Sequence, residues 1–223
     1  MGLTIHFEAS IPITENIIKK LQAVRQKCMD LPFEEVSDVK HQHITKEDIV
    51  FYRGLQRRFN YPFNSIENLK HRDQLLEERG LDTWTMIMVD EKKHPQDYET
   101  ATLDLWAGEG CEGTNLIFSK KRKYWRCKGF TKTQYAEQFV KCHLLVIRAL
   151  DLLKEQGFEV KVKDEGHYWK TRDLEVLAQN INDYTTLIKN LFGTITTQLE
   201  SNNDIKIVAP IEGCENYMVV KDE

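Results

Sequence analysis

The chain has 223 residues, of which 41% are hydrophobic and 30% charged, so it is long enough to bury one sizeable core. No apolar run approaches the roughly 18 residues that a membrane-spanning helix needs, which argues against a membrane partner. The formal net charge of −4 argues against a general polyanion binder, because nucleic-acid affinity comes mainly from neutralising phosphates.

The cysteines and the first residues favour a cytoplasmic location. The opening MGLTIHF has neither the basic region nor the apolar region of a secretory signal. The number of cysteines is odd and none lies in a CxxC pair, a usage typical of reduced thiols in a cytosol; they are Cys28, Cys111, Cys127, Cys142 and Cys214. We therefore expect these thiols to be packing residues.

The first part of the chain predicts a strand, a helix and a second strand. Residues 3–9 alternate apolar and polar side chains, which indicates a strand with one solvated face. Apolar residues then recur at helical spacing and predict a helix that Thr14 caps and Pro32 closes. Residues 33–44 predict the second strand.

The next segment predicts two helices and a short strand. Thr45 and Asp48 form a capping box with Asp in the place of Glu, which predicts a helix start. A second helix is predicted over residues 65–79, with Gly80 as its stop. The apolar run at residues 84–89 is short, so we expect a buried strand there.

The central part predicts an antiparallel meander followed by a buried helix. Residues 102–106, 114–119 and 124–130 have strand character and are joined by GEGCEG and KKRK. Residues 133–156 leave almost no polar face, so we expect this helix to form the centre of the core.

The C-terminal part predicts an edge strand and a long helix. Residues 158–162 alternate as an edge-like strand, and Thr171 then caps a helix that extends to residue 195. The segment at residues 201–223 either returns as a strand or forms a mobile tail.

The order of elements predicts an α+β fold, because strands come in runs and do not alternate regularly with helices. We expect a mostly antiparallel sheet packed against a buried central helix and a long C-terminal helix. Residues 1–223 are predicted to form a single domain with one core. Residues 45–80 are a candidate helical insertion, and the polar loop at residues 91–100 is the weakest point for a boundary.

Four blocks of sequence resemble a bacterial family of uncharacterised proteins. They occur in the same order and read GLTIHF, GCEGTNLIF, GFTKTQYA and DEGHYWKTRDLEVL. The resemblance covers the first strand and residues 101–190. It implies kinship and supports the element boundaries, and it implies no activity.

Two histidines are the best metal-ligand candidates. His41 and His43 lie two positions apart, so on a strand their imidazoles share one face. A third ligand would have to come from His6 or from the segment at residues 164–167. Exposed histidines at a solvated strand end are the simpler interpretation, so we predict no cofactor, with a divalent metal as the alternative.

Asp164, Glu165 and His167 bring two carboxylates and an imidazole to a turn before a helix, and these groups suit general acid and base catalysis. A structural role explains them equally, because carboxylates near a first helical turn stabilise the helix dipole. Tyr168 and Trp169 then clamp the loop to the core. We favour the structural interpretation.

Two further patterns resemble functional motifs, but we interpret both as structural. Residues 108–113 match GxGxxG, but a strand is predicted to follow, so a turn is expected in place of a dinucleotide site. Cys142 and His143 are adjacent on a helix, where neighbours point about 100° apart. We therefore expect both to be packing residues.

Six of the nine residues at 120–128 are basic, and two aromatic residues lie among them. Such a hairpin can follow phosphates while an aromatic ring stacks on a base. A solvated turn whose charges protect a sheet edge is the alternative. The predicted binding surface consists of Lys121, Arg122, Lys123, Tyr124, Trp125, Arg126, Lys132, Tyr168 and Trp169.

These observations favour a non-enzymatic binding module whose partner is another protein. The first alternative is a metal-dependent or acid/base enzyme of the hydrolase type that combines the HxH strand with the DEGH loop. The second alternative is nucleic-acid binding through the basic hairpin.

Overall fold

The computed structural model describes residues 3–59, 66–90, 97–133, 136, 138–180, 206–208 and 217–220. The elements in chain order are β1 (Thr4–Pro12), α1 (Ile17–Met29), β2 (Glu35–Val36), β3 (Lys40–Ile44), α2 (Lys46–Phe59), α3 (Ile66–Glu78), α4 (Thr83–Asp90), β4 (Tyr98–Trp106), β5 (Thr114–Lys121), β6 (Tyr124–Lys132), α5 (Phe139–Glu155), β7 (Glu159–Asp164), α6 (Tyr168–Thr171), β8 (Lys206–Val208) and β9 (Tyr217–Val220). Residues 174–180 are also helical. The predicted α+β class is confirmed.

Seven strands form one antiparallel sheet. Its order is β2-β4-β5-β6-β1-β7, and β3 pairs with the same edge of β4 that β2 pairs with further along. The run β4-β5-β6 is the predicted meander. In the described part of the chain β7 pairs only with β1, so it is the edge strand that its alternating sequence predicts.

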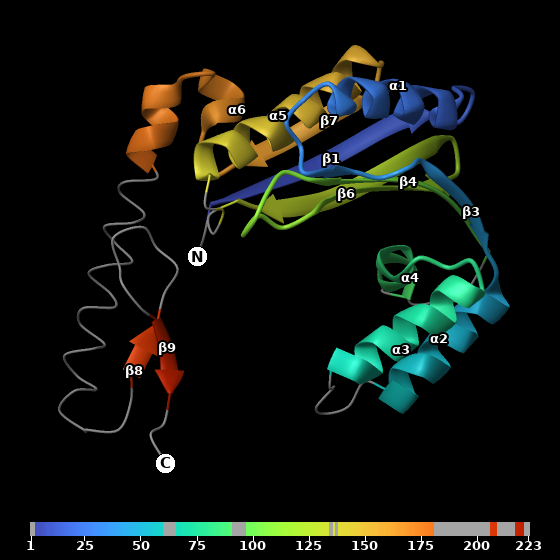
Figure 1. The fold of residues 1–223 in the computed structure, drawn as a ribbon. Coiled ribbons are helices and arrows are strands. Elements are labelled where there is room, and N and C mark those ends of the chain that lie inside the picture. Colours follow the sequence, from blue (N-terminus) through green and yellow to red (C-terminus); the bar gives the residue numbers. More distant parts are fainter. Residues whose placement is uncertain are drawn as a thin grey trace.

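Helices α1 and α5 cover one face of the sheet, here called the inner face (Figure 1). Side chains of β1 that point to this face pack with both helices in the main hydrophobic core. The close fit is visible where Phe7 of β1 lies opposite Gly129 of β6, because a Cβ at position 129 would lie 2.7 Å from the Phe7 ring. The prediction that the central helix is buried is confirmed, although α5 begins at Phe139 and not at Thr133.

Helices α2, α3 and α4 form a second group of elements, the helical lobe, below the β3 edge of the sheet (Figure 1). The lobe has its own buried cluster, which differs from the single core expected from the sequence. Ile44 and Tyr98, from the paired strands β3 and β4, belong to this cluster and join the lobe to the sheet. An ion pair of 3.6 Å between Lys40 and Asp82 lies at the same junction.

The capping box is present as predicted. The Thr45 amide donates to the Asp48 carboxylate at 2.9 Å, and the Asp48 amide donates to the Thr45 hydroxyl at 3.2 Å. The predicted strand at residues 84–89 is wrong, because this run forms helix α4. Asp82 caps α4 by accepting from the Thr85 amide at 2.8 Å. A short apolar run has no periodicity that separates a buried strand from a buried helix.

Three other predicted boundaries differ from the structure. Residues 33–44 form two short strands, β2 and β3, in place of one. Helix α1 is capped by Asn16, whose side chain accepts from the Lys19 amide, and not by Thr14. The helix that starts at residue 174 is capped by Asp173, which accepts from the Glu175 amide at 2.8 Å.

The predicted course of the C-terminal helix from residue 181 to 195 lies outside the described residues. Within the predicted tail, β8 and β9 form a two-stranded antiparallel sheet, and the remainder of residues 201–223 also lies outside them. None of the helices that the structure describes has the length and apolar character that crossing a membrane requires.

Candidate functional site

The face of the sheet opposite α1 and α5, here called the outer face, carries a regular series of side chains on β6. Alternation along the strand turns every second residue to this face, and burial follows that alternation. Tyr124 is 40% exposed and Phe130 is 52% exposed, so neither ring is covered. We call the series the β6 row; its members are Tyr124, Arg126, Lys128, Phe130 and Lys132.

Cations of the β6 row lie close to its aromatic rings. The Arg126 guanidinium is 5.6 Å from the centre of the Tyr124 ring, and the Lys132 ammonium is 5.7 Å from the centre of the Phe130 ring. Both distances are within the range of cation–π attraction. Along the strand the row therefore reads ring, cation, cation, ring, cation, and each ring has a cation beside it.

Neighbouring strands extend this surface. Glu8 of β1 lies beside Lys128 and forms an ion pair of 3.1 Å, but both side chains are more than half exposed, so the pair is weak. On β7, Lys161 and Lys163 are paired in register with β1 and are also exposed. On the other side, Lys121 of β5 lies opposite Tyr124. The outer face carries more cations than carboxylates although the whole chain is acidic, and Lys132 and Lys161, like Lys128, each have an acidic partner, Glu112 at 3.5 Å and Glu159 at 3.4 Å.

Trp125 does not belong to the exposed surface that the sequence predicts. It is 4% exposed and packs in the main core, on the inner face of β6. Its ring lies 6.2 Å from the His41 ring and 5.7 Å from the Lys120 ammonium. Adjacent residues on a strand point to opposite faces, so Tyr124 and Trp125 cannot both face outward.

The hairpin between β5 and β6 turns at Arg122 and Lys123. Arg122 has φ +55°, in the left-handed region that is unfavourable for residues with a Cβ. Arg122→Gly is therefore expected to stabilise the protein by about 0.5–1 kcal/mol, because glycine adopts this conformation without strain. Urea denaturation measures the change, and Lys123→Gly, at a position without positive φ, is expected to destabilise and serves as control. A destabilised Arg122→Gly protein would contradict the strain argument.

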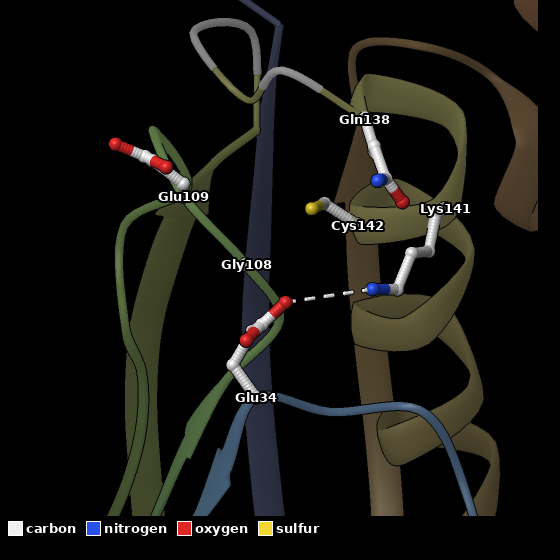
Figure 2. Close-up of a pocket in the computed structure, with 6 residues that line it drawn as sticks. All are labelled: Glu34, Gly108, Glu109, Gln138, Lys141 and Cys142. Carbon is white, nitrogen blue, oxygen red and sulfur yellow. Dashed lines mark ion pairs between the residues drawn. The ribbon is translucent and has the colours of Figure 1, made fainter.

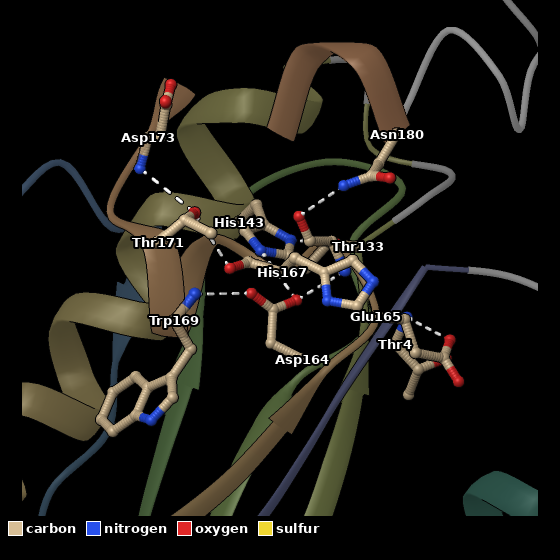
Figure 3. A network of polar contacts seen from close by, with 11 residues as sticks. Thr4, Thr133, His143, Asp164, Glu165, His167, Trp169, Thr171, Asp173 and Asn180 are labelled. Atoms are coloured by element: carbon tan, nitrogen blue, oxygen red, sulfur yellow. Dashed lines mark hydrogen bonds and ion pairs between the residues drawn. The ribbon is translucent and has the colours of Figure 1, made fainter. Parts of the chain in front are cut away.

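The DEGH turn lies at the end of β7 and is the centre of a buried polar network (Figure 3). One oxygen of Asp164 accepts from the Gly166 amide at 2.7 Å, and the other accepts from the Trp169 amide at 2.8 Å. The first oxygen also lies 3.3 Å from Nε2 of His143 on α5. On the other side of the ring, Nδ1 of His143 lies 3.1 Å from the Thr133 hydroxyl.

The network keeps the Asp164 carboxylate ionised. Burial raises the pKa of Asp164, but contact with His143 and the amides of Trp169 and Gly166 outweighs this effect. The resulting pKa lies below the ordinary value of 3.8. Because the Thr133 and His143 side chains are fully buried, the arrangement resembles a catalytic relay in residue type but offers no surface to a substrate.

Sequence reasoning missed the role of His143. Its neighbour in the sequence is Cys142, whereas its partner Asp164 comes from a strand that follows the helix. One signal was available, because a histidine in an otherwise apolar helix must find a buried polar partner. Of the other members of the turn, Gly166 is buried, Glu165 is partly exposed and accepts from the Thr4 amide at 3.0 Å, and His167 is exposed.

Tyr168 and Trp169 are half-buried and pack against the core. The Arg172 guanidinium lies 4.6 Å from the centre of the Trp169 ring, and the Lys154 ammonium lies 5.4 Å from it. Arg172 also forms two hydrogen bonds of 2.7 and 2.8 Å with Asp151. These contacts hold the turn to α5.

The structure separates the predicted metal ligands. His41 and His43 share the inner face of β3, and their nearest carboxylates are Glu99 at 3.1 Å and Asp97 at 4.0 Å. His6 lies on the outer face of β1, 3.8 Å from Glu165. Among the described residues no group of three or more histidine, cysteine or acidic side chains is arranged to hold a metal.

The DEGH turn and the HxH strand also lie at opposite edges of the sheet. Strand β7 and strand β3 are five strand spacings apart, which is about 24 Å at roughly 4.8 Å per spacing. Asp164 and His41 therefore cannot share one pocket. An enzyme that combines both motifs has no structural basis in these positions.

A small pocket of about 100 Å³ lies between the GEGCEG turn and the start of α5 (Figure 2). Glu34 and Lys141 form an ion pair of 3.7 Å across it. Gly108 approaches Cys142 so closely that a Cβ would lie 3.2 Å from its sulfur, which gives this glycine a packing role. Burial raises the pKa of the Cys142 thiol, so the thiol is a poor nucleophile.

The turn joins β4 to β5, as its sequence predicts, and no helix follows its glycines. Glu34 and Glu109 line the pocket and would repel a phosphate. Among the described residues, the β6 row combines exposed aromatic rings with cations, so it is the candidate binding surface. Comparison of the chain with protein-family models, with curated proteins and with solved structures finds no match, so the family resemblance stays an expectation.

Proposed function

We propose that the protein is a non-enzymatic binding module that holds a nucleic acid on its outer face. The observation that supports this function most is the β6 row, in which exposed rings and cations lie together on one face of one strand. Cations neutralise phosphates, which supplies affinity, while aromatic rings stack on bases. A surface with only one of these features would not favour this ligand.

The charges around the β6 row have the sign that a polyanion needs. Arg126 and Lys128 occupy the middle of the row, Lys121 lies on the neighbouring strand β5, and Lys161 and Lys163 lie on β7, on the far side of β1. A negative whole-chain charge does not oppose this function, because charge screening limits interactions to about 10 Å at 0.1 M salt. A protein partner with an acidic surface is the alternative ligand.

The test is fluorescence anisotropy with a labelled oligonucleotide of mixed sequence, at about 50 mM and 200 mM salt. Binding is expected to weaken steeply with salt. Arg126→Ala/Lys128→Ala is expected to weaken binding about tenfold and to reduce the slope of log affinity against log salt by about 1.4, since about 0.7 is lost per phosphate contact on a single strand.

The matched control removes two cations from the helices. Lys19→Ala/Lys170→Ala changes the net charge by the same amount at positions on α1 and α6. This variant is expected to bind as the wild type does. Equal losses in both double variants, or no salt-dependent binding at all, would overturn the nucleic-acid function and direct the search to an acidic protein partner.

A further inference from the structure

We infer that the ligand of the outer face is a single-stranded nucleic acid whose bases stack on Tyr124 and Phe130. This inference rests on the proposed function and makes it more specific. It is carried by the two exposed rings of the β6 row, which lie on one face of one strand.

The spacing of the two rings suits an extended single strand of nucleic acid. Tyr124 and Phe130 are six positions apart, which corresponds to about 20 Å at roughly 3.3 Å per residue. Arg126 and Lys128 lie between them on the same face. A nucleic-acid strand that places one base on each ring must therefore pass its phosphates over these two cations.

The state of the bases decides between single strands and duplexes. In a duplex the faces of the bases are hidden by their neighbours in the stack, so an aromatic side chain reaches them only where they are unpaired. The rings of the β6 row would find no partner on a continuous helix.

The shape of the surface also disfavours a duplex. Strands β5, β6, β1 and β7 lie side by side, and the axes of the outermost two are about 14 Å apart at roughly 4.8 Å per spacing. The major groove of DNA is about 12 Å wide and admits a helix or a two-stranded ribbon. A four-stranded face lies against the backbone of a duplex without entering its groove.

Two neighbours of Phe130 extend the surface on which a base could stack. The His6 ring, across the ladder on β1, lies 6.0 Å from the Phe130 ring at an interplanar angle of 45°. The Lys132 ammonium, two residues further along β6, lies 5.7 Å from the centre of the Phe130 ring. Histidine rings also stack on unpaired bases. Lys128 must exchange its exposed contact with Glu8 for a phosphate, and such exposed pairs are weak.

The experiment compares a single strand with the duplex of the same sequence by anisotropy, using oligonucleotides of about 16 residues, the upper end of single-stranded sites. Wild type is expected to bind the single strand at least about tenfold more tightly than the duplex. Tyr124→Ala and Phe130→Ala are each expected to weaken single-strand binding about tenfold with little change in salt slope. Deoxy and ribo forms of the oligonucleotide distinguish DNA from RNA.

Conservative variants separate stacking from folding. Tyr124→Phe and Phe130→Tyr keep a ring at each position and are expected to retain binding. Retained binding in both alanine variants, or equal affinity for the duplex, would overturn the inference. If Arg126→Ala/Lys128→Ala still weakens binding in that case, the nucleic-acid function stands, whereas absence of all binding overturns both.

Discussion

Replacing Asp164 by alanine is expected to destabilise the protein by about 3–5 kcal/mol. The carboxylate accepts from the amides of Gly166 and Trp169 and contacts His143. Its removal leaves these groups without an acceptor in a buried site, and each unsatisfied donor costs about 1–3 kcal/mol. Chemical denaturation with urea, followed by far-ultraviolet circular dichroism, measures the loss.

The neighbouring Glu165→Ala variant is the control, because that carboxylate is partly exposed and accepts one backbone hydrogen bond. Its effect is expected to be about 1 kcal/mol or less. The lowered pKa of Asp164 also fixes the direction in which its contribution to stability changes with pH. Its contribution to stability is present above the unfolded value near 3.8 and is lost as pH falls through the folded value. A similar loss in both variants at pH 7 would contradict the assigned role of the network.

Asp104→Asn is expected to stabilise the protein by about 2–3 kcal/mol at pH 8 and by much less at pH 4.5. Asp104 lies on β4, where burial and the nearby charge of Asp82 raise its pKa to about 6, against the opposing effect of Lys40. One of its carboxylate oxygens is buried without a hydrogen-bond partner among the described residues. The native state therefore holds an ionised group in an unfavourable site at pH 8.

The raised pKa of Asp104 fixes the direction in which stability changes with pH. Stability linked to protonation of Asp104 is fully present below the ordinary value of 3.8 and is lost as pH rises through about 6. Asparagine keeps the shape of the neutral acid and removes this loss. Midpoints of urea denaturation at the two pH values measure the difference, with Asp38→Asn as control because that carboxylate is 87% exposed. A gain that is the same at both pH values would argue against the buried charge.

The fold class could be predicted because it depends on local patterns. Alternation defined the strands of the meander, and the capping box at Thr45 marked the start of α2. Helix α4 could not be recognised in the same way, since its run of eight residues is too short and apolar for a period to show. The second core depends on contacts between α2, α3 and α4, which no local pattern contains.

The candidate site was only half visible in the sequence. Tyr124, Arg126 and Phe130 share one face of the strand predicted at residues 124–130, but the lysines of β7 join them only through the pairing of β6 with β1 and of β1 with β7. The local sequence of one segment does not determine which distant strand it pairs with, or in which register. Trp125 was placed on the wrong side, although strand alternation alone opposes it to Tyr124.

The helical lobe leaves the sheet at Ile44 and returns at Tyr98, and these two residues are partners in the ladder. The two ends of the lobe therefore meet at one ladder pair, so a change in its length is expected to have little effect on the strands that flank it. Doubling such a loop costs only about 0.6 kcal/mol in closure entropy. A lobe of a different length can therefore be joined to the same ladder pair while the β6 row stays unchanged.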